Sequence, residues 1–374
     1  MKQETDLEDF MKRADIPTPA ILINLDQVDE NILKMVHESR KHGIAHRPHI
    51  KSHKCVELAK RQLELGACGI TCAKLGEAEV MFDAGITDIL LAYPLIGSDK
   101  MDRLGKLLER GARIRTIVNS LPGAEGLSRL GETLQRPIEV LIEVDGGINR
   151  GGLKPGAATL AFAEAIRGMA GIRVTGIMYY SGGLGNINTH EGVRAKSLVE
   201  RSDMLATASL LREHGFDMMV LSGGSSFSSK NPDCLEGITE CRAGNYIFND
   251  VSQLMIGYAQ PKTCALTALV TVISRPDAFS AIIDAGSKTL SSDLNALHSG
   301  YGYVIEDPRV RIVKLNEEHG FLHSDAEIDF AIGEKITIIP NHACVLPNLA
   351  DELYGMRGDT VDRMLKVDAR GKNR

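Results

Sequence analysis

A lysine between two histidines stands at the end of one of the chain's short apolar segments. Residues 47–54 read R-P-H-I-K-S-H-K. Alternate residues of an extended chain project to one side, so His49, Lys51 and His53 are expected to share a face. A lysine among other cations loses its proton more readily, and a neutral amine can form a Schiff base with a carbonyl compound. A solvated basic turn would have the same composition, so both interpretations stay open at this point.

Two later turns carry groups that suit an anion. Residues 143–152 place four glycines around Arg150, an arrangement that suits a tight loop presenting its guanidinium to an anionic group. Residues 222–226 read S-G-G-S-S, and their amides and hydroxyls could cradle a phosphate, with further amides from residues 242–246. Plain surface turns have similar compositions. The position of each turn directly after a predicted strand favours one shared site.

A histidine and a cysteine two residues apart form the most unusual pair near the end of the chain. Residues 340–344 read P-N-H-A-C, and side chains at positions i and i+2 of a strand project to the same side. His342 and Cys344 could therefore reach one metal ion, and imidazole with thiolate favours Zn2+ over Mg2+ or Ca2+. More often, such a pair is simply a buried cysteine beside a hydrogen-bonded histidine, without a metal.

The elements that must position these groups alternate between apolar strand-like runs and amphipathic helical segments. Such alternation predicts parallel β/α architecture, and eight units close into a barrel within about 200 to 250 residues. In a barrel the active site lies where the strands end, which is where the turns described above fall. An open doubly wound sheet is the alternative. The predicted strands are residues 20–25, 44–50, 69–73, 88–93, 114–119, 138–144, 174–180 and 218–221.

The pattern changes after about residue 250, where long helical spacers are missing. Strand-like runs there predict a mostly antiparallel β domain. We therefore expect a barrel at residues 18–250 and a β domain at residues 251–374, with residues 1–17 packing on the latter. The basic residues 366–374 are expected to form a frayed tail. The strand-like runs are residues 265–274, 279–284, 310–315 and 335–340.

Composition excludes several classes of protein. The 374 residues hold 43 Lys and Arg against 49 Asp and Glu, and a net charge of -6 without basic runs argues against a nucleic-acid partner. The apolar residues 86–96 include Asp88 and are too short to span a bilayer, and residues 1–15 lack a signal core. Seven scattered cysteines do not suggest a disulfide framework. These features predict a cytoplasmic enzyme without a membrane partner.

The order of these segments resembles the D-threonine aldolase and D-serine dehydratase branch of the fold-type III pyridoxal-phosphate enzymes. The matches at residues 47–54 and 340–344 are the most specific, and together the matching stretches extend over nearly the whole chain. The resemblance implies a (β/α)8 TIM barrel of alanine racemase type, followed by a mostly antiparallel C-terminal β domain. It also implies a homodimer. The other matching stretches are residues 18–20, 74–79, 222–226, 244–248, 284–288 and 318–320.

The resemblance implies a role for each candidate residue. Lys51 matches the lysine that holds pyridoxal 5'-phosphate, and His49 lies beside it. Arg150 matches an arginine near the ring oxygen of the cofactor, and Tyr180 matches an aromatic residue next to the cofactor. His342 matches one metal ligand and Cys344 another, for a divalent metal that is expected to be zinc, with manganese or magnesium as alternatives. The residues that match the phosphate-binding turns are Ser222, Gly224, Ser225, Ser226, Gly244, Asn245 and Tyr246.

Two lyase reactions on a small D-3-hydroxy amino acid fit this set. If Lys51 removes the Cα proton, loss of the β-hydroxyl gives a 2-oxo acid and ammonia. If a base takes the β-hydroxyl proton, the Cα–Cβ bond breaks and gives glycine and an aldehyde. In this family His-x-Cys is typical of dehydratases and His-x-Asp of aldolases, so Cys344 favours dehydration. Asn186 favours it too, because it stands where aldolases tend to have a histidine and cannot take a proton at neutral pH.

Three further points keep alternatives open. His190 could replace the missing histidine of an aldolase, although it is expected to lie on a helix. Ala73 stands where the family often has a glutamine, which predicts an unusual substrate preference. A racemase would need a second base such as Tyr301 or Tyr303, and a metal-free racemase gives the His-x-Cys pair no role. A non-catalytic carrier of pyridoxal phosphate would lack the C-terminal β domain.

Overall fold

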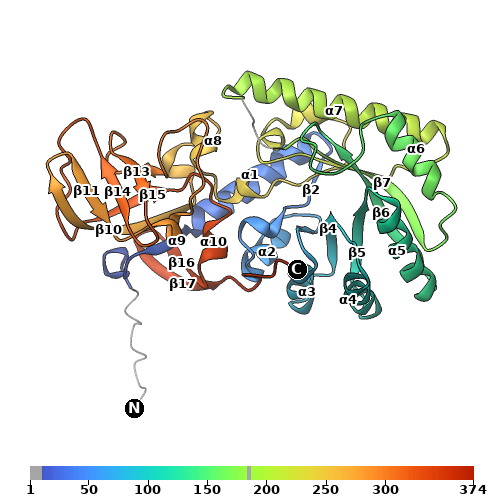
Figure 1. Ribbon diagram of the computed structural model, residues 1–374, viewed down its shortest axis with the longest axis horizontal. Helices are drawn as coiled ribbons and strands as arrows, with labels where there is room; N and C mark the ends of the chain where they lie inside the picture. The colour runs from blue at the N-terminus through green and yellow to red at the C-terminus, as the bar shows by residue number, and fades with distance from the viewer. Residues whose placement is uncertain (1–10, 183–186) are drawn as a thin grey trace, which may run out of the picture. The chain divides into compact units, whose positions relative to one another are not determined.

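The computed structural model describes residues 11–182 and 187–374 (Figure 1). These residues form two compact units. One contains residues 11–30 together with Phe248–Met255 and Ala259–Val367. The other contains Asn31–Ile247, apart from residues 183–186, together with Ile256–Tyr258 and Asp368–Arg374. In the described part of the chain, no helix is both long enough and apolar enough to cross a membrane.

Eight parallel strands of the described residues make up the sheet of the second unit, in the order β2-β9-β8-β7-β6-β5-β4-β3. The two ends of this order meet, because the His46 carbonyl accepts the Cys68 amide at 2.9 Å and the Pro48 carbonyl accepts the Thr71 amide at 2.8 Å. The strands therefore close into a barrel, as predicted. The strands are β2 (Ala45–His46), β3 (Ile70–Cys72), β4 (Asp88–Pro94), β5 (Arg113–Val118), β6 (Ile138–Asp145), β7 (Ile172–Tyr180), β8 (Val220–Gly223) and β9 (Glu240–Cys241).

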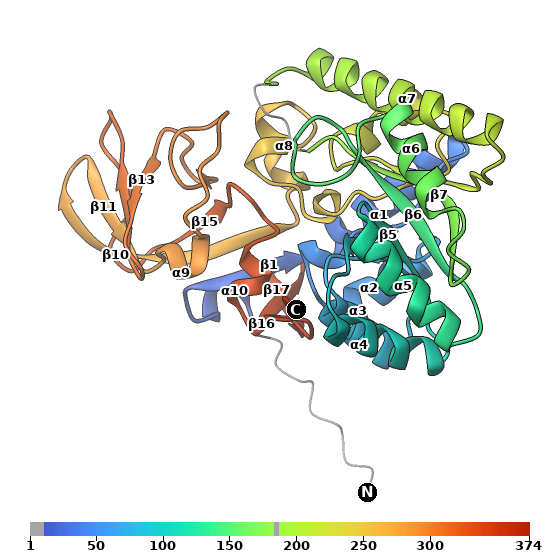
Figure 2. The same cartoon turned by 45° about the vertical axis from the view of Figure 1, so that its right-hand side comes forward.

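Apolar residues cover both faces of the central barrel strands, which explains why these strands are continuous apolar runs in the sequence. Leu90 packs with Ile117, Leu141 and Met178 in one buried cluster, whereas its neighbour Ile89 joins the larger cluster with helix residues. The helices lie outside the strands in Figure 2. They are α1 (Leu25–Lys41), α2 (Val56–Glu64), α3 (Leu75–Asp83), α4 (Ser98–Glu109), α5 (Leu121–Thr133), α6 (Ala157–Ile166) and α7 (His190–Glu213).

The sheet of the first unit is mostly antiparallel, as predicted. Its order is β11-β14-β13-β12-β15-β10-β1-β16-β17, and one pair, β1 with β16, is parallel. The strands are β1 (Ala20–Asn24), β10 (Leu266–Asp277), β11 (Ser280–Ile283), β12 (Tyr303–Val304), β13 (Arg311–Leu315), β14 (Gly320–His323), β15 (Lys335–Ile339), β16 (Glu352–Arg357) and β17 (Thr360–Lys366), and the short helices are α8 (Val251–Met255), α9 (Ser287–Leu290) and α10 (Leu346–Leu349).

The prediction that residues 20–25 form the first barrel strand is wrong. Strand β1 pairs with β10 and β16 in the nine-stranded sheet, and the barrel instead obtains its eighth strand from Glu240–Cys241. An apolar run fits the interior of either sheet, so its pairing depends on contacts far along the chain. A two-residue strand has no periodicity from which it could be predicted. Lys51 therefore follows the first barrel strand.

The prediction of a frayed tail at residues 366–374 is also wrong. Lys366 ends strand β17, and residues Asp368–Arg374 belong to the barrel unit. Ala369 is fully buried, and its amide donates to the Lys54 carbonyl at 2.9 Å. A basic composition suggests solvation, but here one small apolar residue and the backbone anchor the segment.

Candidate active site

Lys51 lies directly after strand β2, on a single turn of 3-10 helix, η2 (Ile50–Ser52). Its side chain is exposed, while its neighbours Ile50 and Ser52 are buried. The His53 amide closes the turn by donating to the Ile50 carbonyl at 3.0 Å, and the Lys54 amide donates to the same carbonyl at 2.8 Å. The turn thus presents one amine from a backbone that is anchored on both sides.

His53 does not share the exposed face of Lys51, contrary to the expectation for an extended segment, because residues 50–52 are helical. Its ring is fully buried, with Nε2 3.2 Å from Gln62 Oε1 and Nδ1 accepting the Cys55 amide at 3.1 Å. Burial lowers the pKa of His53 to about 4. His53 is therefore a neutral part of the barrel wall at pH 7.

Replacing His53 with glutamine is expected to reduce the loss of unfolding free energy that occurs when the pH falls from 7 to 4. In the wild type, the unfolded chain binds a proton at His53 below its ordinary pKa of 6.5, whereas the folded protein does not until about pH 4. Stability is therefore lost as the pH falls through this window, by up to about 1.4 kcal/mol per pH unit. Urea unfolding between pH 7 and pH 4 measures the slope, and substitution of the exposed His37 should leave it unchanged.

His49 joins the Lys51 turn to strand β3. Its Nδ1 accepts the Lys51 amide at 3.4 Å, and its ring also bonds to the backbone of Thr71. Burial holds the pKa of His49 well below its usual range, and the positive charges of Lys51 and Arg242 lower it further. The imidazole is neutral at pH 7 and stands among cations.

A buried network at the ends of strands β8 and β9 contains charged residues that the sequence patterns missed. Arg242 donates to Ser222 Oγ at 2.9 Å and to the Tyr179 carbonyl at 2.8 Å. Ser222 donates to Glu240 at 2.7 Å, and Glu240 also accepts Arg47 Nε at 2.8 Å. The Ser222 hydroxyl is thus committed to the barrel framework. Charged residues within short parallel strands were the signal that could have revealed this network.

Arg150 and Tyr180 lie close together. The guanidinium carbon of Arg150 lies 4.8 Å from the centre of the Tyr180 ring, within cation–π range. Buried Glu143 lies close enough that the charges of Arg150 and Arg242 lower the pKa of its carboxyl, although burial has the larger effect and raises it overall. The positive charges of two arginines from different loops thus act on one buried carboxylate.

The loop that carries Arg150 is organised by one carboxylate. Asp145 Oδ1 accepts the amides of Gly147, Ile148 and Asn149 at 3.0 to 3.2 Å. Gly147 has a φ of 99°, a value that glycine adopts without strain. This explains why a glycine-rich stretch presents an arginine in a defined position.

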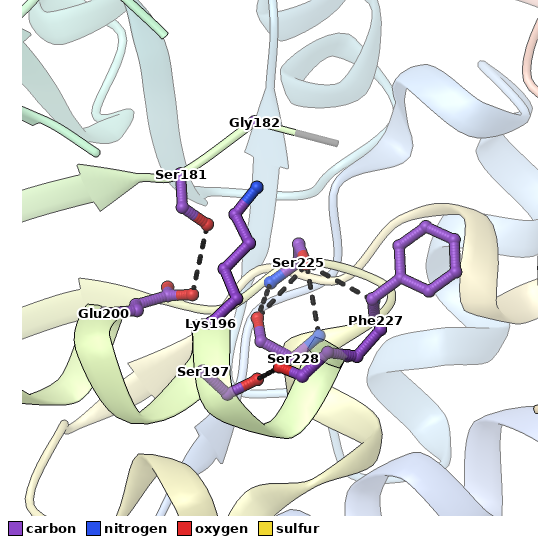
Figure 3. A pocket seen from close by; sticks show the side chains of 9 residues that line it. Ser181, Gly182, Lys196, Ser197, Glu200, Ser225, Phe227 and Ser228 are labelled. Carbon is purple, nitrogen blue, oxygen red and sulfur yellow. Dashed lines mark hydrogen bonds between the residues drawn. The ribbon is translucent and has the colours of Figure 1, made fainter. Parts of the chain in front are cut away.

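Glu200 of helix α7 binds both the serine turn after strand β8 and Ser181 after strand β7. Figure 3 shows its bond with Ser181. The buried Glu200 carboxylate accepts the Gly224 amide at 2.6 Å, and Ser181 Oγ donates to it at 3.4 Å. Burial raises the pKa of Glu200, while the bonds from Gly224 and Ser228 lower it. A small pocket adjoins these groups, lined by Ser181, Gly182, Val193, Lys196, Ser197, Glu200, Ser225, Phe227 and Ser228.

Hydrogen bonds within the serine turn occupy two of its amides. The Gly224 amide binds Glu200, and the Ser225 amide donates to Ser228 Oγ at 2.8 Å. A Cβ atom on Gly224 would lie 2.6 Å from Ser229 Oγ, and its φ is 76°, so this position requires glycine. The Ser225 hydroxyl is engaged as well, because it accepts the Phe227 amide at 3.3 Å and the Ser228 amide at 3.2 Å. The turn is therefore held together by its own hydrogen bonds.

Replacing Glu200 with alanine is expected to lower the free energy of unfolding by about 1 to 3 kcal/mol, because the buried Gly224 amide loses its acceptor. Glutamine at position 200 retains an acceptor oxygen and should restore most of the loss. Denaturant unfolding measures both variants. Glu191→Ala, at an exposed position of the same helix, is the matched control. Equal stability of Glu200→Ala and this control would contradict the assignment.

Residues 244–246 pack directly against the Lys51 turn. A Cβ atom on Gly244 would lie 2.6 Å from Ser52 Oγ and 2.8 Å from the His49 carbonyl. The following residues form a short 3-10 helix, η5 (Asn245–Ile247). Tyr246 is buried, and its hydroxyl accepts Gln62 Nε2 at 2.9 Å. The Tyr246 side chain is therefore engaged inside the barrel unit, and only the backbone of this residue is available to a ligand.

Three other positions singled out in the sequence have defined surroundings or lie outside the structure. The His190 ring stacks on Tyr258 with 4.1 Å between ring centres, at the start of helix α7. The Ala73 amide donates to Glu77 at 2.6 Å, at the start of helix α3. Asn186 lies outside the described residues.

His342 and Cys344 lie in the loop after strand β15 of the first unit, rather than in the strand itself. Their side chains are nevertheless hydrogen-bonded, and this bond, with the negative charges of Cys344, Asp250 and Asp293, raises the pKa of His342 to about 9. Asp250 also accepts the Ala343 amide at 3.3 Å, which anchors the loop. Among residues 11–182 and 187–374, no three His, Cys, Asp or Glu side chains converge on one metal position.

Two family models and several relatives match the chain. The alanine racemase N-terminal domain matches residues 23–251, and the serine dehydratase domain matches residues 265–356. A D-threo-3-hydroxyaspartate dehydratase from Delftia sp. (strain HT23) is 33% identical, over 88% of this chain and 91% of the relative. A D-threonine aldolase from Arthrobacter sp is 32% identical, over 96% of this chain and 94% of the relative.

Solved structures agree with these matches. The D-threonine aldolase from Filomicrobium marinum has a TM-score of 0.89 and 31% identity, covering 98% of this chain and 99% of that one. An alanine racemase from Clostridium difficile 630 has a TM-score of 0.68 at 14% identity, a likeness that shows the fold alone. The chain therefore belongs to the family of D-serine dehydratases and D-threonine aldolases, whose barrel is the alanine racemase N-terminal domain.

Proposed function

We propose that this protein is a pyridoxal-phosphate-dependent lyase of D-3-hydroxy amino acids, and that it dehydrates them to a 2-oxo acid and ammonia. The observation that carries the proposal is the Lys51 turn, which presents a single exposed amine at a barrel strand end beside the neutral His49. The names of the relatives support the substrate class, because they include D-threo-3-hydroxyaspartate dehydratase, D-threonine aldolase and D-serine dehydratase.

The residues around Lys51 fit pyridoxal phosphate. Gly244 allows the backbone of residues 244–246 to approach the Lys51 turn, a space that any larger residue would fill. We assign the phosphate to this backbone together with the turn at Ser225 and Ser226, and the ring face to Tyr180, with Arg150 at the ring oxygen. When bound, the cofactor supplies an electron sink for the electron pair left at the substrate Cα.

Within this proposal the protein's own groups have distinct tasks. The Lys51 ε-amine holds the cofactor and takes the Cα proton of the substrate. His49 holds the turn that carries Lys51, because its Nδ1 accepts the Lys51 amide at 3.4 Å while its ring bonds to Thr71. Because His49 is neutral at pH 7, the positive charge in this part of the site comes from the guanidinium groups of Arg150 and Arg242. A carboxylate substrate is therefore favoured over a neutral one.

We further propose that His342 and Cys344 hold a divalent metal, with zinc the best match to an imidazole and a sulfur ligand. Two protein ligands leave positions for substrate or water, and the bound ion would supply Lewis acidity for departure of the β-hydroxyl. The loop is anchored by Asp250, so both ligands start from a fixed backbone. Solved relatives support this: D-threo-3-hydroxyaspartate dehydratase has been solved as a histidine mutant and as a cysteine mutant in the metal-free form, at positions two residues apart.

A retro-aldol lyase is the second candidate, because a D-threonine aldolase is 32% identical and two 3-hydroxy-D-aspartate aldolases also match. Product analysis separates the two. The protein is incubated with pyridoxal phosphate, Zn2+ or Mn2+, and D-threonine, D-serine or D-3-hydroxyaspartate. Ammonia and a 2-oxo acid are expected. Glycine and an aldehyde would make the protein an aldolase, and no product from any substrate would contradict both candidates.

A further inference from the structure

Residues Asp368–Arg374, which we call the strap, return to the barrel unit after strand β17 and lie beside helix α3 (Figures 1 and 2). Ala369 of the strap is fully buried in the main apolar cluster of that unit. The strap is thus an integral part of the barrel unit, although more than three hundred residues separate it from the Lys51 turn in sequence.

The strap binds Lys54 and Val56, which follow the Lys51 turn. The Ala369 amide donates to the Lys54 carbonyl at 2.9 Å. Asn373 Oδ1 accepts Lys54 Nζ at 2.9 Å. Asp368 Oδ2 accepts the Val56 amide at 2.8 Å. Two side chains and one backbone group therefore hold the same short stretch of chain.

Lys54 is the link between the strap and Lys51. The Ile50 carbonyl of the η2 turn accepts the His53 amide at 3.0 Å and the Lys54 amide at 2.8 Å, so Lys54 is one of the two donors that hold the turn. Lys54 has a φ of 54°, a left-handed conformation that is unfavourable for a residue with a side chain and needs support from its surroundings. Its ammonium lies 3.5 Å from the buried Glu77 carboxylate, in addition to its bond with Asn373. The strap therefore supports a residue on which the geometry of the Lys51 turn depends.

The strap also completes the ends of two helices that follow barrel strands. Val56 is the first residue of α2, and the preceding Cys55 gives that helix no side-chain cap among the described residues. Asp368 takes over this function from a distant part of the sequence. The Gly76 amide, in the first turn of α3, donates to the Arg374 backbone oxygen at 2.8 Å. The strap therefore supplies acceptors for two first-turn amides, one in α2 and one in α3, that have no acceptor within their own helices.

We propose that the strap sets the geometry of the Lys51 turn, and that Asp368 and Asn373 are positioning residues for Lys51. They act through Lys54 and Val56 and do not touch the reacting atoms. The consequence for the reaction rests on the role proposed for Lys51, whereas the effect of the strap on the turn does not. Without these contacts we expect the turn to open locally while the rest of the barrel stays folded.

Hydrogen exchange of the cofactor-free protein tests the structural part. Asp368→Ala and Asn373→Ala are expected to speed amide exchange at residues 54–56 by about tenfold, with unchanged exchange in strands β6 and β7. Asp368→Asn keeps a capping oxygen and should behave as the wild type. Lys372→Ala, at an exposed strap position, is the matched control. Unchanged exchange at residues 54–56, or an equal increase throughout the barrel, would overturn the proposal.

Titration with pyridoxal phosphate tests the link to Lys51. Asp368→Ala and Asn373→Ala are expected to raise its dissociation constant about fivefold or more, with rescue by Asp368→Asn. Faster exchange at residues 54–56 with unchanged cofactor affinity would overturn the positioning role and leave the proposed function intact. A wild-type protein that binds no pyridoxal phosphate would instead contradict the proposed function, and hydrogen exchange alone would then decide whether the strap holds the turn.

Discussion

Replacing Lys51 with alanine is expected to abolish covalent retention of pyridoxal phosphate and to lower turnover by about a thousandfold or more, because one side chain supplies both the attachment and the proposed base. The Lys51 side chain is exposed on a turn whose neighbours are buried, so its removal should leave the fold intact. Visible absorbance of the cofactor-loaded protein and mass spectrometry after borohydride reduction measure the retention.

The other lysines near this turn give the experiment its controls. Lys60→Ala, at an exposed position of helix α2, should keep both the cofactor and the activity. Lys54 is unsuitable as a control, because its ammonium is bound to Asn373 and lies 3.5 Å from Glu77, so its loss would disturb the turn itself. Covalent cofactor in Lys51→Ala after borohydride reduction would refute the assignment of Lys51.

Replacing Cys344 with alanine is expected to cut both metal content and turnover, each by about tenfold or more, because the site has only two protein ligands in our proposal and removal of one leaves a single histidine. The change should also return the pKa of His342 from about 9 toward its ordinary value of 6.5, since the bond to Cys344 is the largest cause of the increase. Elemental analysis of purified protein measures the metal, and histidine NMR of the metal-free protein measures the pKa.

Cys68→Ala, which also removes a thiol but at an exposed position in the barrel unit, is the control for Cys344→Ala. It should bind as much metal as the wild type. If Cys344→Ala does so too, the His342–Cys344 pair is a structural hydrogen bond and the metal part of the proposal fails. Cofactor retention by Lys51 and metal content at Cys344 are independent readouts, because the two residues belong to different compact units.

Short motifs identified the candidate residues of the site because the groups in each motif are local in sequence. Lys51 and His49 are two residues apart, as are His342 and Cys344, and the structure keeps both pairs in contact. Backbone geometry still changed one expectation, since a single 3-10 turn at residues 50–52 directs His53 into the barrel wall. The side on which a residue projects depends on local φ and ψ angles, which the alternation of an assumed strand cannot supply.

The individual bonds of the buried network behind the site could not be predicted from the sequence, because they join residues from different strands, turns and helices. Arg242 meets Ser222 and Tyr179 through the register of β7, β8 and β9, and Glu200 reaches Gly224 from helix α7. No spacing in the sequence encodes these distances. Hydrogen bonds between distant residues form only once the sheet has closed.

The sequence by itself determined the fold class and the positions of the candidate turns, since hydrophobic periodicity and turn composition are local properties of the chain. Tertiary structure decided which sheet an apolar run joins, so that Ala20–Asn24 lies in the nine-stranded sheet and Glu240–Cys241 completes the barrel. It also decided that Asp368–Arg374 docks on the barrel unit instead of fraying. The physical reason is the same in each case: strand pairing and docking depend on partners far along the chain, and local propensity does not identify those partners.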